Sequence, residues 1–253
     1  MREPLYNQRF DDIYFSPEDG LAETCHVFLA GNGLPQRWQD RKHFTIVETG
    51  FGTGLNCLAV WALFEETAQT GQTLDIISFE RYPLCREDIL QALGEWREVL
   101  GGRLEKMLRL YPLRVPGFHR LQLGPQVRLT LVFDDVNTAL PELIVPGGVD
   151  AWFLDGFAPS KNPDMWTETL YGEMARLSTA GTTAATFTVA GHVRRGLAAA
   201  GFSVEKAPGL VRKKDMTVAR SGVDTKGVNE RLNQAKRLCI FGVGLHTTCA
   251  EVG

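Results

Sequence analysis

Long hydrophobic runs are absent from this chain of 253 residues, although 44% of its residues are hydrophobic. No stretch approaches the roughly 20 apolar residues that span a membrane. The first residues, MREPLY, are followed closely by charges and contain no apolar signal core. The sequence therefore predicts a soluble, cytoplasmic protein without a membrane partner. Its length is sufficient for one large α/β domain or for two small ones.

Cysteine is scarce and scattered. The five cysteines are Cys25, Cys57, Cys85, Cys239 and Cys249, and no two of them form a C-x-x-C pair. An odd number without paired spacing argues against a disulfide framework and against a structural zinc site. We therefore expect reduced thiols and no bound metal.

Three alternating glycines, Gly50, Gly52 and Gly54, follow a short apolar strand and precede an apolar helical run. Glycine lets the backbone turn sharply and lets a ligand approach closely, which predicts a nucleotide-sized cofactor. The spacing G-x-G-x-G differs from the dinucleotide fingerprint G-x-G-x-x-G. Glu48, just before the first glycine, suits a cationic amine better than a pyrophosphate. Together these features indicate S-adenosylmethionine (SAM); the alternative is an ordinary glycine-rich turn.

Strand and helix signals alternate from residue 44 onward, which predicts an α/β fold with a doubly wound parallel sheet. The seven expected strands cover residues 44–47, 74–79, 127–133, 149–154, 183–188, 202–206 and 216–219. The last two are joined by a loop too short for a parallel crossover, so the last strand is antiparallel. This seven-stranded, Rossmann-like arrangement is that of the class I SAM-dependent methyltransferases.

Three parts are expected along the chain. Residues 1–40 are polar and aromatic and are predicted to form an N-terminal lid or small hairpin, with a helix over 21–29. Residues 41–220 form the methyltransferase domain. Residues 221–253 are a polar linker and, from residue 238, the start of a second nucleotide-binding-like segment, whose 16 residues are far fewer than the roughly 30 of a βαβ unit.

Acidic residues follow the second and third strands. Glu80 is placed to accept hydrogen bonds from ribose hydroxyls, because strand ends meet at the ligand-binding edge of an open α/β sheet. Its alternative role is a local pair with Arg81. Asp135 is predicted to contact the adenine amino group, and its alternative role is a helix N-cap.

Asp155 follows the fourth strand at the same edge. A carboxylate there can accept an N–H from a substrate amine and direct its lone pair, and positioning supplies most of the acceleration in such a transfer. Phe157 can pack on a flat base or a cation. The alternatives are a turn cap for Asp155 and a core position for Phe157. Lys161 and Trp166 lie in a polar loop that we expect to contact substrate, unless it is a solvent-exposed turn.

Positive charge is not in excess, since the net charge is −3. The whole surface is therefore not expected to attract nucleic acid, but a local basic face remains compatible with this value. Such a face is predicted from Arg194, Arg195, Arg212, Lys213 and Lys214, which suit contact with RNA phosphates. The alternative is a solvated surface.

Several motifs resemble one known family, the methyltransferase domain of the bifunctional tRNA 5-methylaminomethyl-2-thiouridine biosynthesis proteins (MnmC). The matching runs are FDDIYF at 10–15, ETGFGTGLN at 48–56, ISFE at 77–80, WFLDGFAP at 152–159, KNPDMW at 161–166 and VRRGL at 193–197. The resemblance covers residues 6–220. It implies SAM-dependent conversion of the 5-aminomethyl group of a tRNA wobble (2-thio)uridine, in the anticodon loop, to 5-methylaminomethyl. Asp155 would engage the aminomethyl nitrogen.

In that family an FAD-dependent oxidoreductase domain follows the methyltransferase. Here residues 221–253 could hold only its first residues, with Thr247 where glycine or alanine is usual, so FAD and the oxidase step are not expected.

Two other functions fit the same motifs. One is transfer of a methyl or aminopropyl group to a small-molecule amine, and the other is a SAM-binding or tRNA-binding module without catalysis. The basic residues favour RNA, because a polyamine site should be acidic.

Overall fold

The computed structural model describes residues 5–15, 20–210 and 215–222. The predictions for Arg212, Lys213 and Lys214 lie outside the described residues. So does the second glycine-rich segment, within residues 223–253.

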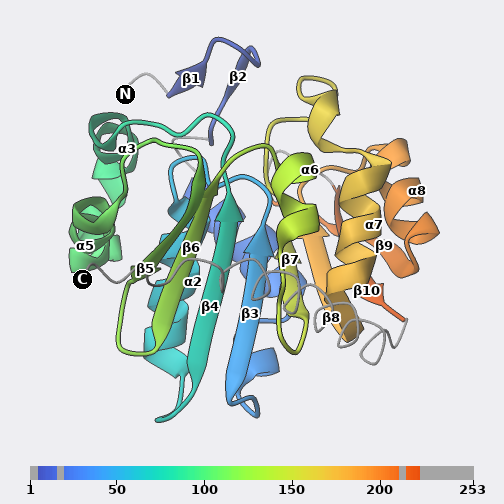
Figure 1. Cartoon of the computed structure of the whole chain (residues 1–253), viewed down its shortest axis with the longest axis horizontal. Helices are drawn as coiled ribbons and strands as arrows, with labels where there is room; N and C mark the ends of the chain where they lie inside the picture. The colour runs from blue at the N-terminus through green and yellow to red at the C-terminus, as the bar shows by residue number, and fades with distance from the viewer. Residues whose placement is uncertain (1–4, 16–19, 211–214, 223–253) are drawn as a thin grey trace, which may run out of the picture.

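A twisted sheet runs through the molecule in the strand order β5-β6-β4-β3-β7-β8-β10-β9 (Figure 1). The five neighbouring strands from β6 to β8 are parallel to one another. Strand β10, between β8 and β9, is antiparallel to both of them. The predicted fold class is thereby confirmed. The bounds are His43–Glu48 (β3), Thr73–Phe79 (β4), Val127–Phe133 (β6), Val149–Phe153 (β7), Ser178–Thr186 (β8), Phe202–Pro208 (β9) and Asp215–Ser221 (β10).

The sheet has an eighth strand that the sequence did not predict. Residues 113–124 were expected to be an irregular connection, but β5 (Gly117–Gln122) pairs antiparallel with β6 along its whole length. Its alternate residues are exposed, and it carries His119 and Arg120, so it lacks an apolar strand signal. It forms because β6 otherwise has an open edge, where an added antiparallel strand satisfies the backbone hydrogen bonds.

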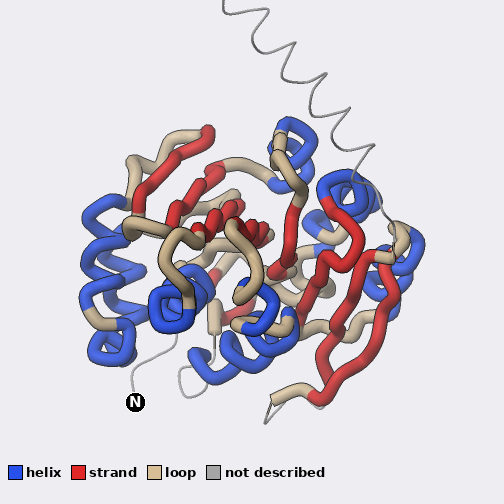
Figure 2. Tube along the Cα trace, turned by 90° about the horizontal axis from the view of Figure 1, so that it is seen from below, coloured by secondary structure: helices blue, strands red, loops and turns tan. Residues whose placement is uncertain are grey.

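Helices cover both faces of the sheet (Figure 2). One core cluster includes side chains of the helices that follow β3 and β4, and a second includes those of the helices that follow β6, β7 and β8. The first group is α2 (Leu55–Thr67), α3 (Arg86–Leu93), α4 (Arg97–Leu100) and α5 (Gly102–Leu110). The second group is α6 (Val136–Ala139), α7 (Glu168–Leu177) and α8 (Gly191–Ala199).

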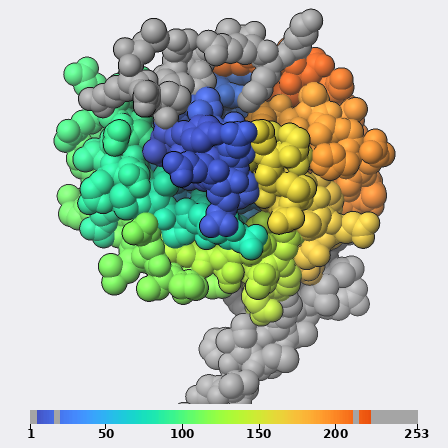
Figure 3. Space-filling view, turned by 90° about the horizontal axis from the view of Figure 1, so that it is seen from above, coloured from blue at the N-terminus to red at the C-terminus, as the bar shows by residue number. Residues whose placement is uncertain are grey.

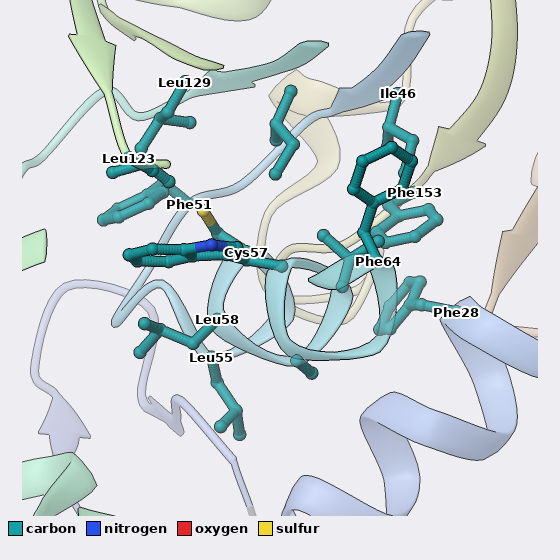
Figure 4. Close-up of a cluster of buried hydrophobic side chains, with 14 of the residues drawn as sticks. Phe28, Ile46, Phe51, Leu55, Cys57, Leu58, Phe64, Leu123, Leu129 and Phe153 are labelled. Carbon is teal, nitrogen blue, oxygen red and sulfur yellow. The ribbon is translucent and has the colours of Figure 1, made fainter. Parts of the chain in front are cut away.

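Helix α2 is buried on nearly all sides, as its apolar sequence predicts. Figure 4 shows its side chains packed between the sheet and the π-helical segment η1 (Thr24–Leu29). Phe64 of α2 is 1% exposed, and Phe28 of η1 reaches Phe153 of β7 with ring centroids 5.5 Å apart. The glycine loop therefore leads into a helix that is fixed by the core.

The N-terminal region divides into two pieces with different packing. Val27, Phe28 and Trp38 are buried, so the helical segment from α1 (Gly20–Glu23) onward belongs to the main core. Only the hairpin of β1 (Tyr6–Asn7) and β2 (Asp12–Ile13) stands above the carboxyl edge of the sheet (Figure 1).

Removing the Phe64 ring tests how strongly α2 is held. Phe64→Ala is expected to lower the free energy of unfolding by about 3–5 kcal/mol, because a fully buried ring leaves a cavity. Urea denaturation measures the change. Phe118→Ala on the edge strand is the control, since Phe118 is 51% exposed; equal effects of the two changes would contradict the packing described for α2.

Candidate functional site

A cavity of about 490 Å³ lies at the carboxyl ends of the central strands. This volume is within the range of small-molecule sites. The hairpin, the glycine loop and the segments after β4, β6 and β7 all contribute to its wall. Of the residues predicted from the sequence, Gly50, Gly52, Glu80, Asp135, Asp155 and Phe157 line it.

The three glycines are required by the packing of the chain itself. A Cβ on Gly50 would lie 2.9 Å from the backbone oxygen of Asp155, where the ends of β3 and β7 approach each other. Gly54 has a φ of +80°, and a Cβ there would lie 2.6 Å from the Phe51 ring. Gly52 has a φ of +52° and faces Tyr14 of the hairpin. Larger residues would therefore strain the loop even without a ligand.

Glu80 ties the glycine loop to the end of β4. Its Oε2 accepts from the Gly52 N–H and its Oε1 from the Tyr82 N–H, both at 2.8 Å. Burial raises the pKa of Glu80, and these two backbone hydrogen bonds oppose the rise. The alternative pair with Arg81 is not formed, because Arg81 pairs instead with Asp135.

Asp135 has the N-cap role that the sequence left open. Its Oδ1 accepts from the Asn137 N–H at 2.8 Å at the start of α6, and its Oδ2 lies 2.7 Å from Arg81 Nη1. The side chain also lines the cavity, so the cap and a ligand contact are compatible at this position.

Glu48 lies behind the cavity wall. It is 1% exposed and is not among the residues that line the cavity. Its Oε1 accepts from Asn56 Nδ2 at 2.8 Å and its Oε2 from Ser78 Oγ at 2.5 Å. Burial, and then the nearby charge of Asp155, raise the pKa of Glu48 to about 8.

Asp155 is held from three directions. Its Oδ1 accepts from the Gly156 N–H at 2.8 Å, and its Oδ2 accepts from Asn56 Nδ2 at 2.6 Å. Its backbone oxygen accepts from Thr49 Oγ1 at 2.7 Å. Asn56 was not predicted as a site residue, although its position at the end of the glycine motif was a signal for one.

The hairpin forms one wall of the cavity above Phe157. Phe10 stacks on Phe157 with ring centroids 4.6 Å apart, and Tyr14 meets the same ring edge-on at 5.2 Å. Lys161 Nζ pairs with Asp11 at 2.5 Å. Seen from above, the hairpin lies between the teal segment after β4 and the yellow segment after β7 (Figure 3). Lys161 thus binds the hairpin and is not part of the cavity lining.

Three other predicted residues lie away from the cavity lining. Trp166 is 6% exposed and belongs to the second core cluster, which gives its ring a packing role. Arg194 and Arg195 lie on α8, where Arg194 Nε donates to the Val189 oxygen at 3.2 Å and Arg195 is exposed.

In the described part of the chain, no group of three or more His, Cys, Asp and Glu side chains could hold a metal ion. None of the helices described is long and apolar enough to cross a membrane.

The comparisons with known proteins first define a class. A family model described as S-adenosyl-L-methionine-dependent methyltransferase matches residues 99–221. The structure is similar to the crystal structure of MNMC2 from Aquifex aeolicus, with a TM-score of 0.68 at 23% identity, covering 90% of this chain and 71% of that chain. Together with the strand order, these findings make the chain a class I SAM-dependent methyltransferase.

Similarity to curated proteins then defines the family. The chain is 48% identical over 216 residues to the tRNA 5-methylaminomethyl-2-thiouridine biosynthesis bifunctional protein MnmC of Ralstonia nicotianae, covering 85% of this chain and 32% of that protein. It is 47% identical over 250 residues to MnmC of Methylobacillus flagellatus, covering 97% and 37%. These matches place the chain with the methyltransferase domain of the MnmC proteins, and it spans about a third of the length of these relatives.

The raised pKa of Glu48 predicts a pH-dependent stability. The folded protein keeps this proton up to about pH 8, whereas the unfolded chain releases it near pH 4.5. Between these values the free energy of unfolding should fall with rising pH, by roughly 1.4 kcal/mol per pH unit from this one group. Glu48→Gln should remove that fall.

Urea denaturation of the wild type and of Glu48→Gln at pH 5.5, 6.5 and 7.5 measures the difference. Glu142→Gln, at an exposed position, is the control. Parallel pH profiles of the wild type and Glu48→Gln would contradict the prediction.

Proposed function

We propose that the chain methylates the 5-aminomethyl group of a wobble (2-thio)uridine in tRNA, giving 5-methylaminomethyl. The observation that carries the proposal is the Asp155 carboxylate, oriented by two hydrogen bonds at the cavity and followed by the aromatic ring of Phe157. The MnmC relatives are named for tRNA 5-methylaminomethyl-2-thiouridine biosynthesis, which supports this choice of acceptor.

The residues of the cavity fit SAM. The glycine loop allows close approach of a ligand, and Glu80 presents a buried carboxylate acceptor suited to ribose hydroxyls. Asp135 also lines the cavity and is assigned the contact with the adenine amino group. When bound, SAM supplies an electrophilic methyl group.

Asp155 then positions the acceptor amine for transfer. Its carboxylate accepts one N–H of the neutral amine and so directs the nitrogen lone pair, while Phe157 offers a face for the uracil ring. The nitrogen gains the methyl carbon as the carbon–sulfur bond breaks, the bonding electrons stay with sulfur, and the nitrogen releases a proton. Water exclusion by the hairpin, through Phe10 and Tyr14, strengthens these interactions.

Contact with the tRNA backbone is assigned to the basic residues. Arg195 on α8 is exposed, and Arg212, Lys213 and Lys214 follow β9 in the sequence. Their role rests on the sequence pattern, since clustered cations suit phosphates. A tRNA acceptor also implies that the reaction takes place in the cytoplasm.

Replacing Asp155 tests the assignment of the acceptor site. With labelled SAM and tRNA from cells that lack this modification, the wild type should label the wobble uridine. Asp155→Ala should abolish transfer while SAM affinity, measured by calorimetry, stays nearly unchanged.

Asn137→Ala, outside the cavity, is the matched control for a lost polar side chain. A large loss of SAM affinity in Asp155→Ala would return Asp155 to a structural role. Labelling of a small amine by the wild type, without labelling of the tRNA, would favour the small-molecule acceptor.

The basic residues are tested by the salt dependence of binding. Arg212→Ala with Lys213→Ala should weaken tRNA binding and lower the slope of log affinity against log salt by about 1 per lost phosphate contact. The control is Arg120→Ala on β5, at the far edge of the sheet. An unchanged slope would assign these charges to a solvated surface.

A further inference from the structure

Two carboxylates, those of Glu48 and Asp155, face a single side-chain amide. Asn56 Nδ2 donates to Glu48 Oε1 at 2.8 Å and to Asp155 Oδ2 at 2.6 Å, so both hydrogens of the amide group are used. The amide oxygen accepts from Thr24 Oγ1 at 2.8 Å. The Asp155 carboxylate can only accept, Glu48 Oε1 accepts the second N–H, and the Thr24 hydroxyl donates to the amide oxygen, so the orientation of the Asn56 amide is fixed.

The fold itself holds this amide in place. Asn56 is the second residue of α2 and is 5% exposed, while Glu48 ends β3 and is 1% exposed. Ser78 of β4 donates to the second oxygen of Glu48. Asn56 lines the cavity, whereas Glu48 and Ser78 lie behind it. The network therefore runs from the core to the cavity wall.

We propose that Asn56 is a positioning residue that orients the Asp155 carboxylate toward the acceptor amine, with Glu48 as its buried anchor. This inference rests on the proposed function, because it gives Asp155 the acceptor site. Gly156 N–H holds one oxygen of Asp155 and Asn56 holds the other, so rotation of the carboxylate is opposed at both ends. Glu48 thus supports Asp155 through the Asn56 amide.

Orientation matters because the nitrogen lone pair must point along the bond to the methyl group. A misplacement of about 1 Å can cost about 100-fold in rate. A carboxylate that is free to rotate still attracts the amine but directs it less well. Loss of the Asn56 amide should therefore slow transfer more than it weakens binding.

The first test separates rate from affinity. Asn56→Ala should lower the single-turnover rate at saturating SAM and tRNA about 100-fold. The dissociation constants of both ligands should stay within about threefold of the wild type. The control is Asn137→Ala, whose amide donates to the Asp164 oxygen outside the cavity. A wild-type rate for Asn56→Ala, or a loss confined to SAM affinity, would overturn the proposal.

The second test asks whether Glu48 acts as an anchor. Glu48→Gln keeps an oxygen that can accept from Asn56 and should retain the rate within about threefold, whereas Glu48→Ala should lose rate as Asn56→Ala does. Equal losses in both Glu48 variants would refute the anchor. Thr24→Val removes only the hydroxyl that donates to the Asn56 amide oxygen, and it should lower the transfer rate by a smaller factor than Asn56→Ala. This variant tests the positioning role of Asn56 if Asn56→Ala does not fold.

A crystal structure tests whether Asn56 orients the Asp155 carboxylate, and it requires no tRNA acceptor. In crystals of Asn56→Ala or Thr24→Val grown with SAM, the Asp155 carboxylate should turn from its wild-type orientation. An unchanged orientation would overturn the positioning role. By contrast, a wild type that labels no tRNA would overturn only the proposed function, so the two failures are distinguishable.

Discussion

The close approach of the ends of β3 and β7 is the constraint on which the site depends. The strands are paired in parallel, with Glu48 opposite Phe153, so the segments that follow β3 and β7 leave the sheet side by side. Where they leave, Gly50 has no room for a Cβ against the Asp155 backbone. The same close approach lets Thr49 Oγ1 donate a hydrogen bond to the backbone oxygen of Asp155. The glycine loop and the Asp155 carboxylate are thus fixed relative to each other by main-chain geometry.

Helix α2 extends this constraint from the backbone to the side chains. Its first turn follows the glycine loop directly, and its core packing leaves Asn56 little freedom. The amide of Asn56 therefore reaches both strand ends at once, through Glu48 and Asp155. A core helix thereby determines the orientation of a group at the cavity surface.

Much of this arrangement could be predicted from sequence because it follows short-range rules. The glycine spacing, the alternation of strands and helices, and the acids at strand ends place Glu80 and Asp155 at one edge of the sheet. The direction of Glu48 was harder to predict, since it depends on the pleat. In β3, Glu48 has the same parity as Phe44 and Ile46, which face α2. Period-two alternation therefore turns its carboxylate under that helix.

Features that depend on distant partners escaped prediction. Strand β5 exists because β6 has an edge to cover, and no local signal marks it. Lys161 is 150 residues from Asp11, and their pairing needs the folded hairpin. Trp166 stands in a polar run, yet it packs in the core cluster that includes side chains of α7 and α8. In each case tertiary contacts overrode the local pattern.

The docking of the hairpin has a consequence for how salt acts on the protein. The Lys161–Asp11 pair is partly exposed, so added salt screens it, whereas the stack of Phe10 on Phe157 persists. Ionic strength thus loosens the tip of the hairpin without removing its aromatic contact. Salt consequently acts on the Phe157 side of the cavity through an intramolecular ion pair. The glycine loop is held by backbone hydrogen bonds and core packing, so added salt does not loosen it.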